Sequence, residues 1–188
     1  MKSALMFSAV SVALISGCAV PAGAPDDSGS SEGNEVSEVS SALNGPITCT
    51  FQTSNKHYLT AVGGGGRTTD VIHSDATRVG SWERFTLIDS GDGSPNIHYG
   101  VRTTNGHFLT AVGGGGRVTD VIHSDATQLL DWEKFTMISL GFGIYAIQTV
   151  DGHYLTAVGA GGRTTDVIHS DATRIGSWEQ FRLSCTNP

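Results

Sequence analysis

The segment HYLTAVGGGGRTTDVIHSDATRVGSWERF, from His57 to Phe85, decides the fold because it occurs three times in this chain. The other copies run over 107–135 and 153–181, so the copies start 50 and then 46 residues apart. A fixed period of this length predicts a repeat architecture around a pseudo-threefold axis. Triplication also favours binding over catalysis, because an enzyme needs one asymmetric site.

Each repeat contains four short segments in which apolar residues alternate, which is typical of β-strands. In the first repeat these are CTFQ (49–52), HYLTAV (57–62), DVIHS (70–74) and ERFTLI (83–88). No amphipathic helix of useful length is visible. Twelve strands in about 140 residues indicate a closed barrel or sandwich, and the threefold period selects the all-β β-trefoil. We expect this domain over 47–188, with repeats at about 47–96, 97–143 and 144–188.

The first residues predict export. Residues 1–17 combine Lys2 with the apolar stretch ALMFSAVSVALI, which is too short for a membrane span and fits a secretory signal peptide. The end of this stretch resembles a bacterial lipobox, which implies cleavage before Cys18 and a lipid on its thiol. Ordinary signal peptidase cleavage after Ala24 is the alternative, although Pro25 would follow that cut directly. We expect a lipoprotein anchored to a membrane of the bacterial cell envelope, facing the periplasm or the exterior.

Residues 18–46 predict a flexible tether between this anchor and the folded domain. They are rich in Ser, Gly, Ala and Pro and carry five acidic residues and no basic one. The domain itself holds thirteen acidic and ten basic residues, a net charge of about −3 against −7 for the whole chain. No basic patch is visible, so we expect no nucleic-acid partner. We expect the domain to be a monomer.

Two further cysteines bracket the repeats: Cys49 opens the first and Cys185 closes the third. In a closed ring of repeats the first and last strands are neighbours, and an exported chain is in an oxidising compartment. A disulfide is therefore predicted, with two free buried thiols as the alternative. The corresponding pairs in the other repeats are expected to be Tyr99 opposite Asp89 and Tyr145 opposite Ser139.

The strand pattern HYLTAV and the later GSWExF resemble the fascin-like branch of β-trefoils, in which G-K-Y-L-[ST]-A and W-E-x-F strands flank a hairpin. The resemblance covers nearly all of 47–188. Fascin-like modules in bacteria often accompany carbohydrate-active proteins, so the resemblance implies a glycan ligand by association. The Q-x-W signature of ricin-type trefoils is absent, and no sugar-binding residues carry over from that branch.

Repeated polar residues of the segment are the candidate ligand-binding groups. If Ile72 and Ser74 face the core, then Val71, His73 and Asp75 point outward, and His73 and Asp75 either share a ligand or bond each other. Arg67 is expected near Asp70, as a loop clasp or as a pair of groups for sugar hydroxyls. The full candidate set is Arg67, Asp70, His73, Asp75, Arg117, Asp120, His123, Asp125, Arg163, Asp166, His169 and Asp171.

The remaining repeated residues suit structural roles. Trp82, Trp132 and Trp178 are expected in the core rather than as exposed sugar-stacking platforms. The glutamates that follow them (Glu83, Glu133 and Glu179) are expected to bond backbone amides of the preceding turn. The GGGGR run lacks the Lys-Ser/Thr of a phosphate loop, and a hairpin with positive φ explains it better.

Similarity between the copies is concentrated in the second and third strands and their loop, which we interpret as a functional constraint on that hairpin. The second copy departs at Gln128, Leu129, Leu130 and Asp131, where the others have Arg-Val/Ile-Gly-Ser. If Arg78 and Arg174 contact a ligand, the second site is weaker or different.

We therefore expect a non-catalytic, surface-tethered, lectin-like module with up to three equivalent glycan sites. A metal-binding protein that uses the repeated His and Asp residues is one alternative, although no metal-ligand spacing is present. A structural or protein-interaction trefoil is another, with SGDGSPN (90–96) as its candidate loop. We expect no cofactor and no enzyme activity, because no nucleophile with a base and no asymmetric carboxylate pair is recognisable.

Overall fold

The computed structural model describes residues 46–186, and the regular secondary structure of these residues is β-strand apart from four three-residue 3-10 helices. The expected signal peptide (1–17), Cys18 and the tether up to residue 45 lie outside the described residues. Among residues 46–186 no helix is long and apolar enough to cross a membrane. The strands are β1 (Ile47–Gln52), β2 (Tyr58–Ala61), β3 (Ile72–Ala76), β4 (Phe85–Asp89), β5 (His98–Arg102), β6 (Phe108–Ala111), β7 (Ile122–Ala126), β8 (Lys134–Gly141), β9 (Ile144–Gln148), β10 (Tyr154–Ala157), β11 (Ile168–Ala172) and β12 (Phe181–Thr186).

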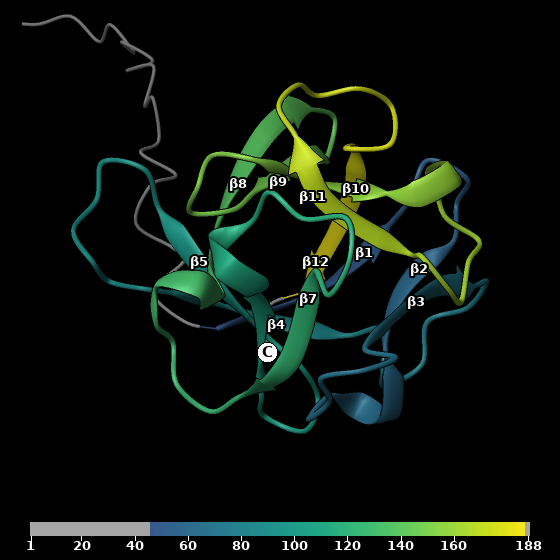
Figure 1. The fold of residues 1–188 in the computed structure, drawn as a ribbon, viewed down its shortest axis with the longest axis horizontal. Helices are drawn as coiled ribbons and strands as arrows, with labels where there is room; N and C mark the ends of the chain where they lie inside the picture. The colour runs from purple at the N-terminus through teal and green to yellow at the C-terminus, as the bar shows by residue number, and fades with distance from the viewer. Residues whose placement is uncertain (1–45, 187–188) are drawn as a thin grey trace, which may run out of the picture. The chain divides into compact units, whose positions relative to one another are not determined.

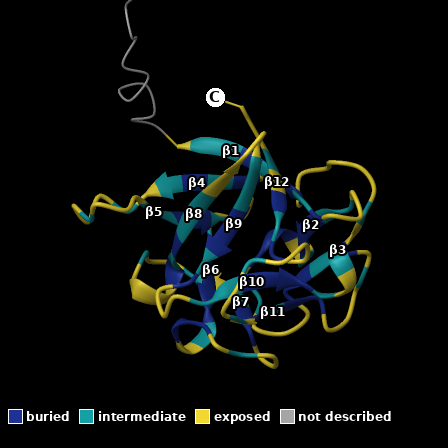
Figure 2. Ribbon diagram, turned by 90° about the horizontal axis from the view of Figure 1, so that it is seen from above, coloured by how far each residue is buried: buried dark blue, intermediate teal, exposed yellow. Residues whose placement is uncertain are grey.

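Six of the twelve strands close into a barrel. Antiparallel pairing runs from β1 to β4, β5, β8, β9 and β12, and β12 pairs with β1 again. The other six strands form three hairpins, β2–β3, β6–β7 and β10–β11, one in each repeat. Figure 1 looks toward the hairpin end, and Figure 2 shows β7 and β11 opposite β1. This is the predicted β-trefoil.

The core is built from equivalent residues of the three repeats. Phe85, Phe135 and Phe181, the last residues of the triplicated segments, are almost completely buried. Leucines from β2, β6 and β10 surround them, together with aliphatic residues of the barrel strands. Burying one such phenylalanine stabilises the fold by about 2–3 kcal/mol. Figure 2 shows the buried strands inside and exposed residues on the connecting loops.

Each third strand begins later than predicted, at residue 72 rather than 70. Asp70 has φ +51°, a left-handed conformation that a strand does not accommodate. The alternation of faces therefore starts at Ile72, and Ser74 faces inward as predicted. Val71 precedes the strand and is buried, so the prediction that it points outward was wrong.

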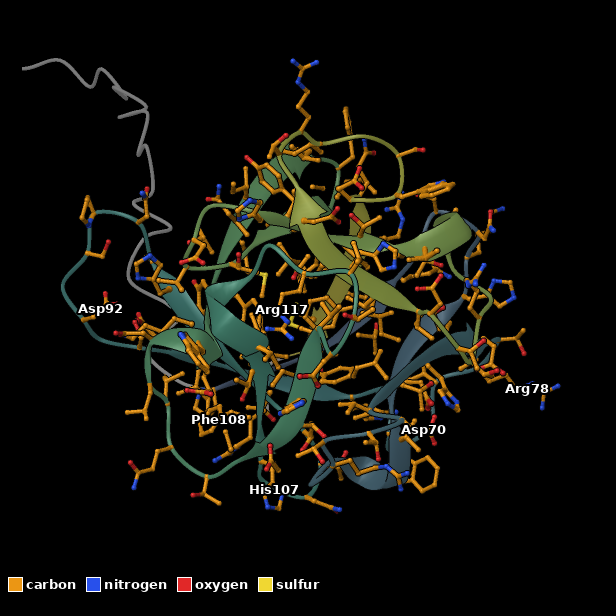
Figure 3. The ribbon with its side chains drawn as sticks, in the orientation of Figure 1. Asp70, Arg78, Asp92, His107, Phe108 and Arg117 are labelled. Atoms are coloured by element: carbon orange, nitrogen blue, oxygen red, sulfur yellow. A yellow bond between two sulfur atoms is a disulfide. The ribbon has the colours of Figure 1, made fainter. Side chains whose placement is uncertain are left out.

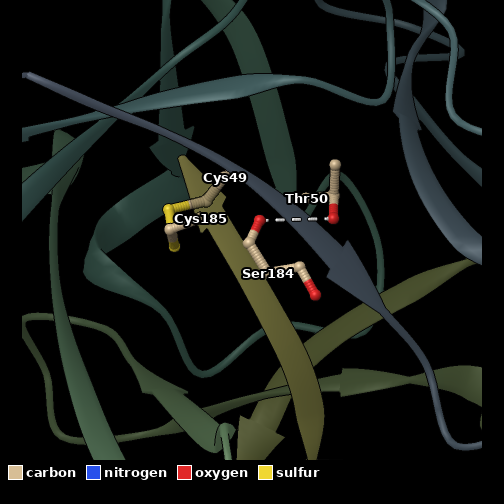
Figure 4. Close-up of a disulfide and its surroundings, with 4 residues drawn as sticks. All are labelled: Cys49, Thr50, Ser184 and Cys185. Carbon is tan, nitrogen blue, oxygen red and sulfur yellow. Dashed lines mark hydrogen bonds between the residues drawn. A yellow bond between two sulfur atoms is a disulfide. The ribbon is translucent and has the colours of Figure 1, made fainter. Parts of the chain in front are cut away.

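The predicted disulfide joins Cys49 to Cys185 and closes the barrel. These residues are register partners on β1 and β12, with their Cα atoms 4.0 Å apart. Beside them the Thr50 hydroxyl donates to the Ser184 carbonyl at 3.5 Å (Figure 4). The corresponding partners in the other repeats are Asp89 with Tyr99 and Ser139 with Tyr145, as predicted. The disulfide thus joins the first and last strands of the barrel covalently.

Three seams hold the repeats to one another at the hairpin end. In the first seam, Gly66 N donates to the Ser124 carbonyl (2.6 Å), Arg67 N to the Ser124 hydroxyl (3.2 Å), and Ser124 N to the Arg67 carbonyl (2.8 Å). The same bonds join Gly116 and Arg117 to Ser170, and Gly162 and Arg163 to Ser74. Each glycine loop therefore clasps the third strand of the next repeat, and the cycle closes.

The glycine run is required by these seams. Gly65 has φ +105°, and a Cβ on it would overlap the Thr103 hydroxyl of the next repeat. The ring of His107 lies directly beyond Gly66. The same neighbours recur in the other two seams, where Gly115 meets Thr149 and Gly161 meets Thr53. Much of the identity between the copies is therefore explained by packing between repeats, rather than by a ligand as we interpreted it from the sequence.

Removing the disulfide should lower the stability of the domain. The bond joins residues 136 positions apart, and chain-entropy arguments give about 4–5 kcal/mol for such a loop. We expect the double variant Cys49→Ser/Cys185→Ser to show a lower midpoint of urea unfolding by roughly that free energy. The reduced wild-type protein should match it. Equal midpoints for the oxidised protein and the double variant would contradict this.

Alanine at Gly65 should destabilise the domain more than alanine at Gly106. Both glycines have positive φ, but a Cβ on Gly106 meets nothing within 4 Å. Gly106→Ala should therefore cost only the left-handed strain of about 1–2 kcal/mol. Gly65→Ala should add about 1–3 kcal/mol of overpacking, together with the strain of a backbone conformation (ψ −172°) that essentially only glycine adopts. Urea unfolding of the two variants measures the difference, and equal losses would contradict this prediction.

Candidate functional site

The predicted Arg–Asp–His groups form one compact clasp in each hairpin. In the first repeat, Arg67 Nη2 lies 3.4 Å from Asp70 Oδ2, and His73 Nε2 donates to Asp70 Oδ1 at 2.7 Å. Arg67 Nε also donates to the Thr69 carbonyl at 3.2 Å. The other repeats reproduce this geometry within 0.1 Å, with Arg117, Asp120 and His123 and with Arg163, Asp166 and His169. Both oxygens of each aspartate are therefore occupied within the loop.

The mutual bond that we considered between His73 and Asp75 is not formed, because His73 bonds Asp70. The left-handed turn at Asp70 brings its carboxylate back under the third strand, which the alternation of faces does not reveal. Asp75, Asp125 and Asp171 are exposed and make no side-chain hydrogen bond or ion pair within residues 46–186. Nowhere in that range do three His, Cys, Asp or Glu side chains come close enough to hold a metal ion.

The three clasps surround a funnel on the pseudo-threefold axis, which we call the axial funnel. Its volume is about 620 Å³, and the same five-residue stretch of each repeat lines it. Exposed threonines and the three aspartates form its rim, and nearly buried valines and isoleucines form its floor. Arg117 lies near the centre of Figure 3 and Arg78 at the edge, pointing outward. The lining residues are 68–72, 118–122 and 164–168.

Neither this funnel nor its threonines were predicted from the sequence. The signal was present, because the stretch Thr-Thr-Asp-Val-Ile, with Val118 in place of the first threonine in the second copy, lies inside the triplicated segment. A repeated stretch next to a pseudo-threefold axis meets its own copies there. The sequence does not show, however, that these residues lie at the axis rather than at the periphery.

The three tryptophans are exposed, and the prediction that they pack in the core was wrong. Trp82, Trp132 and Trp178 leave 47%, 50% and 46% of their surface in solvent. The phenylalanine three positions later enters the core instead. Trp82 lies in the turn that precedes β4, whereas Phe85 is the first residue of that strand and faces inward.

A buried glutamate holds the loop that carries each tryptophan, between the third and fourth strands of its repeat. We call these the tryptophan loops. Glu83 accepts from the Thr60 hydroxyl at 2.8 Å and from Gly80 N at 2.6 Å, which confirms the predicted bond to the preceding turn. The carbonyl of Trp82 accepts from Ala61 N at 2.8 Å. Glu133 and Glu179 make the same pair of side-chain bonds in their repeats. The indole rings of Trp82 and Trp178, whose carbonyls both accept such a bond, are therefore displayed from a backbone that is held on both sides.

Each tryptophan loop except the second also accepts a hydroxyl hydrogen bond from the next repeat. The Thr104 hydroxyl donates to the Ser81 carbonyl at 2.6 Å, and the Ser54 hydroxyl donates to the Ser177 carbonyl. The corresponding residue after the second loop is Val150, which has no hydroxyl. The second loop forms a short 3-10 helix, η4 (Asp131–Glu133), and exposes Leu130 next to its tryptophan. The predicted departure of the second copy is thus a real difference in surface chemistry.

The loop 90–96, our candidate for a protein-interaction loop, is organised around Asp92. His98 Nδ1 lies 2.8 Å from Asp92 Oδ2, and Ser94 N donates to Asp92 Oδ1 at 3.1 Å. Lys134 Nζ lies 3.5 Å from the same carboxylate. The hydrogen bond from His98, followed by that from Ser94, holds the pKa of Asp92 far below its usual value of 3.8.

Asp92 should remain ionised well below pH 3.8. Because its folded pKa is depressed, its stabilising contribution is complete above pH 3.8 and is lost as the pH falls toward the folded pKa. A pH titration of the Asp92 carboxyl carbon by NMR should show a midpoint far below 3.8. In His98→Ala the midpoint should move upward. A wild-type midpoint near 3.8 would contradict the proposed role of the hydrogen bond.

No protein-family model and no curated protein sequence matches the chain. Solved structures with the same fold do match. The designed threefold-symmetric protein ThreeFoil superposes with a TM-score of 0.59 at 16% identity, covering 73% of this chain and 96% of its own. The Rhizoctonia solani agglutinin gives 0.58 at 14% identity (72% and 92%), and SeviL bound to asialo-GM1 saccharide gives 0.54 at 13% (74% and 98%). At these identities the similarity establishes the β-trefoil fold.

Proposed function

We propose that this protein is a non-catalytic, surface-tethered, lectin-like module that binds glycans through its three exposed tryptophans. The observation that carries the proposal is the half-exposed indole ring on a rigid loop, repeated three times. An exposed tryptophan leaves about 100 Å² of apolar surface in water, which forgoes roughly 2–3 kcal/mol of folding stability each time. A ring kept exposed at this cost in all three repeats points to a ligand.

The chemistry of each tryptophan loop suits a sugar. An indole face packs against the apolar C–H face of a pyranose ring, and neighbouring polar groups bond its hydroxyls. Arg78 and Arg174 stand four positions before their tryptophans and make no side-chain hydrogen bond within residues 46–186. Because Glu83 and its equivalents hold the loops in advance, little conformational entropy is lost when a ligand stacks there.

The repeated residues then have two different roles. Arg67, Asp70 and His73, with their equivalents, bond one another and shape the hairpin loops. The tryptophan loops take the ligand-contacting role at the periphery. The similarity in fold to SeviL, solved bound to asialo-GM1 saccharide, and to an agglutinin supports a carbohydrate ligand. Three weak sites on one body held by a lipid anchor at Cys18 would gain avidity of about 10²–10⁴ against a polymer.

The triple variant Trp82→Ala/Trp132→Ala/Trp178→Ala should lose binding to a polysaccharide that retains the wild-type domain. A glycan array identifies the class, and a pull-down with the insoluble polymer measures retention. Phe142→Ala is the matched control, because Phe142 is 97% exposed at the tip of the β8–β9 hairpin, outside the tryptophan loops. Urea unfolding of each variant verifies the fold. Absence of binding by the wild-type domain to every glycan and polymer would overturn the proposal.

The tryptophan loop of the second copy should contribute least to glycan binding. Gln128 replaces the free arginine there, and Leu130 replaces a glycine. We expect Trp132→Ala to reduce retention less than Trp82→Ala or Trp178→Ala in the same assay. Equal losses from all three single variants would show that the arginines do not contact the ligand.

A further inference from the structure

We propose that the axial funnel is a separate binding site, which takes one small uncharged ligand that joins an aliphatic group to a hydroxylated body. Its volume of about 620 Å³ lies within the range of ordinary small-molecule sites, about 300–1,000 Å³. The tryptophans do not line it. This inference is therefore independent of the proposed glycan binding at the periphery.

The floor of the funnel is aliphatic and rigid. It consists of three valines and three isoleucines, each only 7–8% exposed. Branching at Cβ restricts their rotamers, so the floor keeps one shape without a ligand. None of the floor side chains offers a hydrogen bond. The group that reaches the floor must therefore be apolar. The floor residues are Val71, Val121, Val167, Ile72, Ile122 and Ile168.

The rim offers hydrogen bonds but almost no net charge. Five threonines and three aspartates stand around it, and each aspartate is paired with an arginine of its own loop. Each paired carboxylate oxygen retains a second lone pair that can accept from a hydroxyl. The clasps hold these oxygens in place, as His73 does for Asp70. A rim of compensated charges favours an uncharged, hydroxylated ligand over an ion.

The funnel is not fully symmetric, and the difference lies at Val118. The first and third repeats have Thr68 and Thr164 at this position. Val118 removes one hydroxyl from the rim and adds an aliphatic side chain that is 49% exposed. A ligand without threefold symmetry therefore has one preferred orientation, with its aliphatic part toward the second repeat.

Alkyl glucosides of increasing chain length are suitable probes, because each joins an aliphatic chain for the floor to a hydroxylated ring for the rim. Calorimetry with methyl, butyl and hexyl glucoside, with hexyl glucoside kept below its micelle concentration, should give one site per chain. Affinity should rise by up to about fourfold for each methylene that reaches the floor. Methyl NMR signals of Ile72, Ile122 and Ile168 should shift. N-acetylglucosamine tests whether an acetamido methyl suffices as the aliphatic group.

Three variants separate this site from the tryptophan loops. Val121→Phe should fill the floor and abolish hexyl glucoside binding. Val118→Thr, at an exposed position that leaves the fold intact, should weaken hexyl glucoside more than methyl glucoside. The triple tryptophan variant should bind hexyl glucoside as the wild type does, even if its polysaccharide binding is lost. Affinity independent of chain length, isoleucine signals that do not move, or loss of binding in the tryptophan variant would overturn the proposal.

Discussion

The seam between each glycine loop and a buried serine of the next repeat is the interaction on which the rest of the structure depends. Ser74, Ser124 and Ser170 are completely buried, and each exchanges backbone and hydroxyl bonds with a glycine-arginine pair of its neighbour. A hairpin in isolation is marginally stable in water. Linked in a cycle, the three hairpins close one end of the barrel and bring residues 68–72, 118–122 and 164–168 around one axis.

The seams are not equal, and their differences follow from single residues. Asn55 and Asn105 each donate a side-chain amide to a glycine loop, at 3.1 and 3.0 Å. The corresponding residue of the third repeat is Asp151, whose ionised carboxylate has no hydrogen to donate. Val150 beside it lacks the hydroxyl of Ser54 and Thr104. The seam between the second and third repeats is thus the weakest, and it adjoins the loop that departs from the other two.

Apolar side chains reach the surface at two kinds of place. At the periphery, Glu83 and its equivalents are buried so that the tryptophan backbone is fixed while the ring stays in water. At the axis, valines and isoleucines are almost buried and leave only a floor accessible. At both places the exposed apolar residues and their supports belong to the triplicated segment. The identity between the copies therefore reflects seams, loop supports and exposed groups together, which a comparison of the copies cannot separate.

The sequence by itself determined the repeat, the twelve strands, the trefoil and the pairing of Cys49 with Cys185. These follow from local alternation and from the closure of a ring, and both are properties of the pattern. It also indicated the Arg67–Asp70 clasp and the bond from Glu83 to its turn, because the partners are three residues apart. Contacts over such short separations depend little on the rest of the chain.

Only the tertiary structure decided which ring of each Trp-Glu-x-Phe stretch enters the core, and where the third strand begins. The pattern permits either aromatic residue inside, but the buried phenylalanines of three repeats already fill the barrel. The left-handed turn at Asp70 is set by a clasp with His73, and it shifts the strand by two residues. The axial funnel exists because three copies meet at an axis. The three copies meet because the ring of repeats is closed, and no single stretch of the sequence encodes that closure.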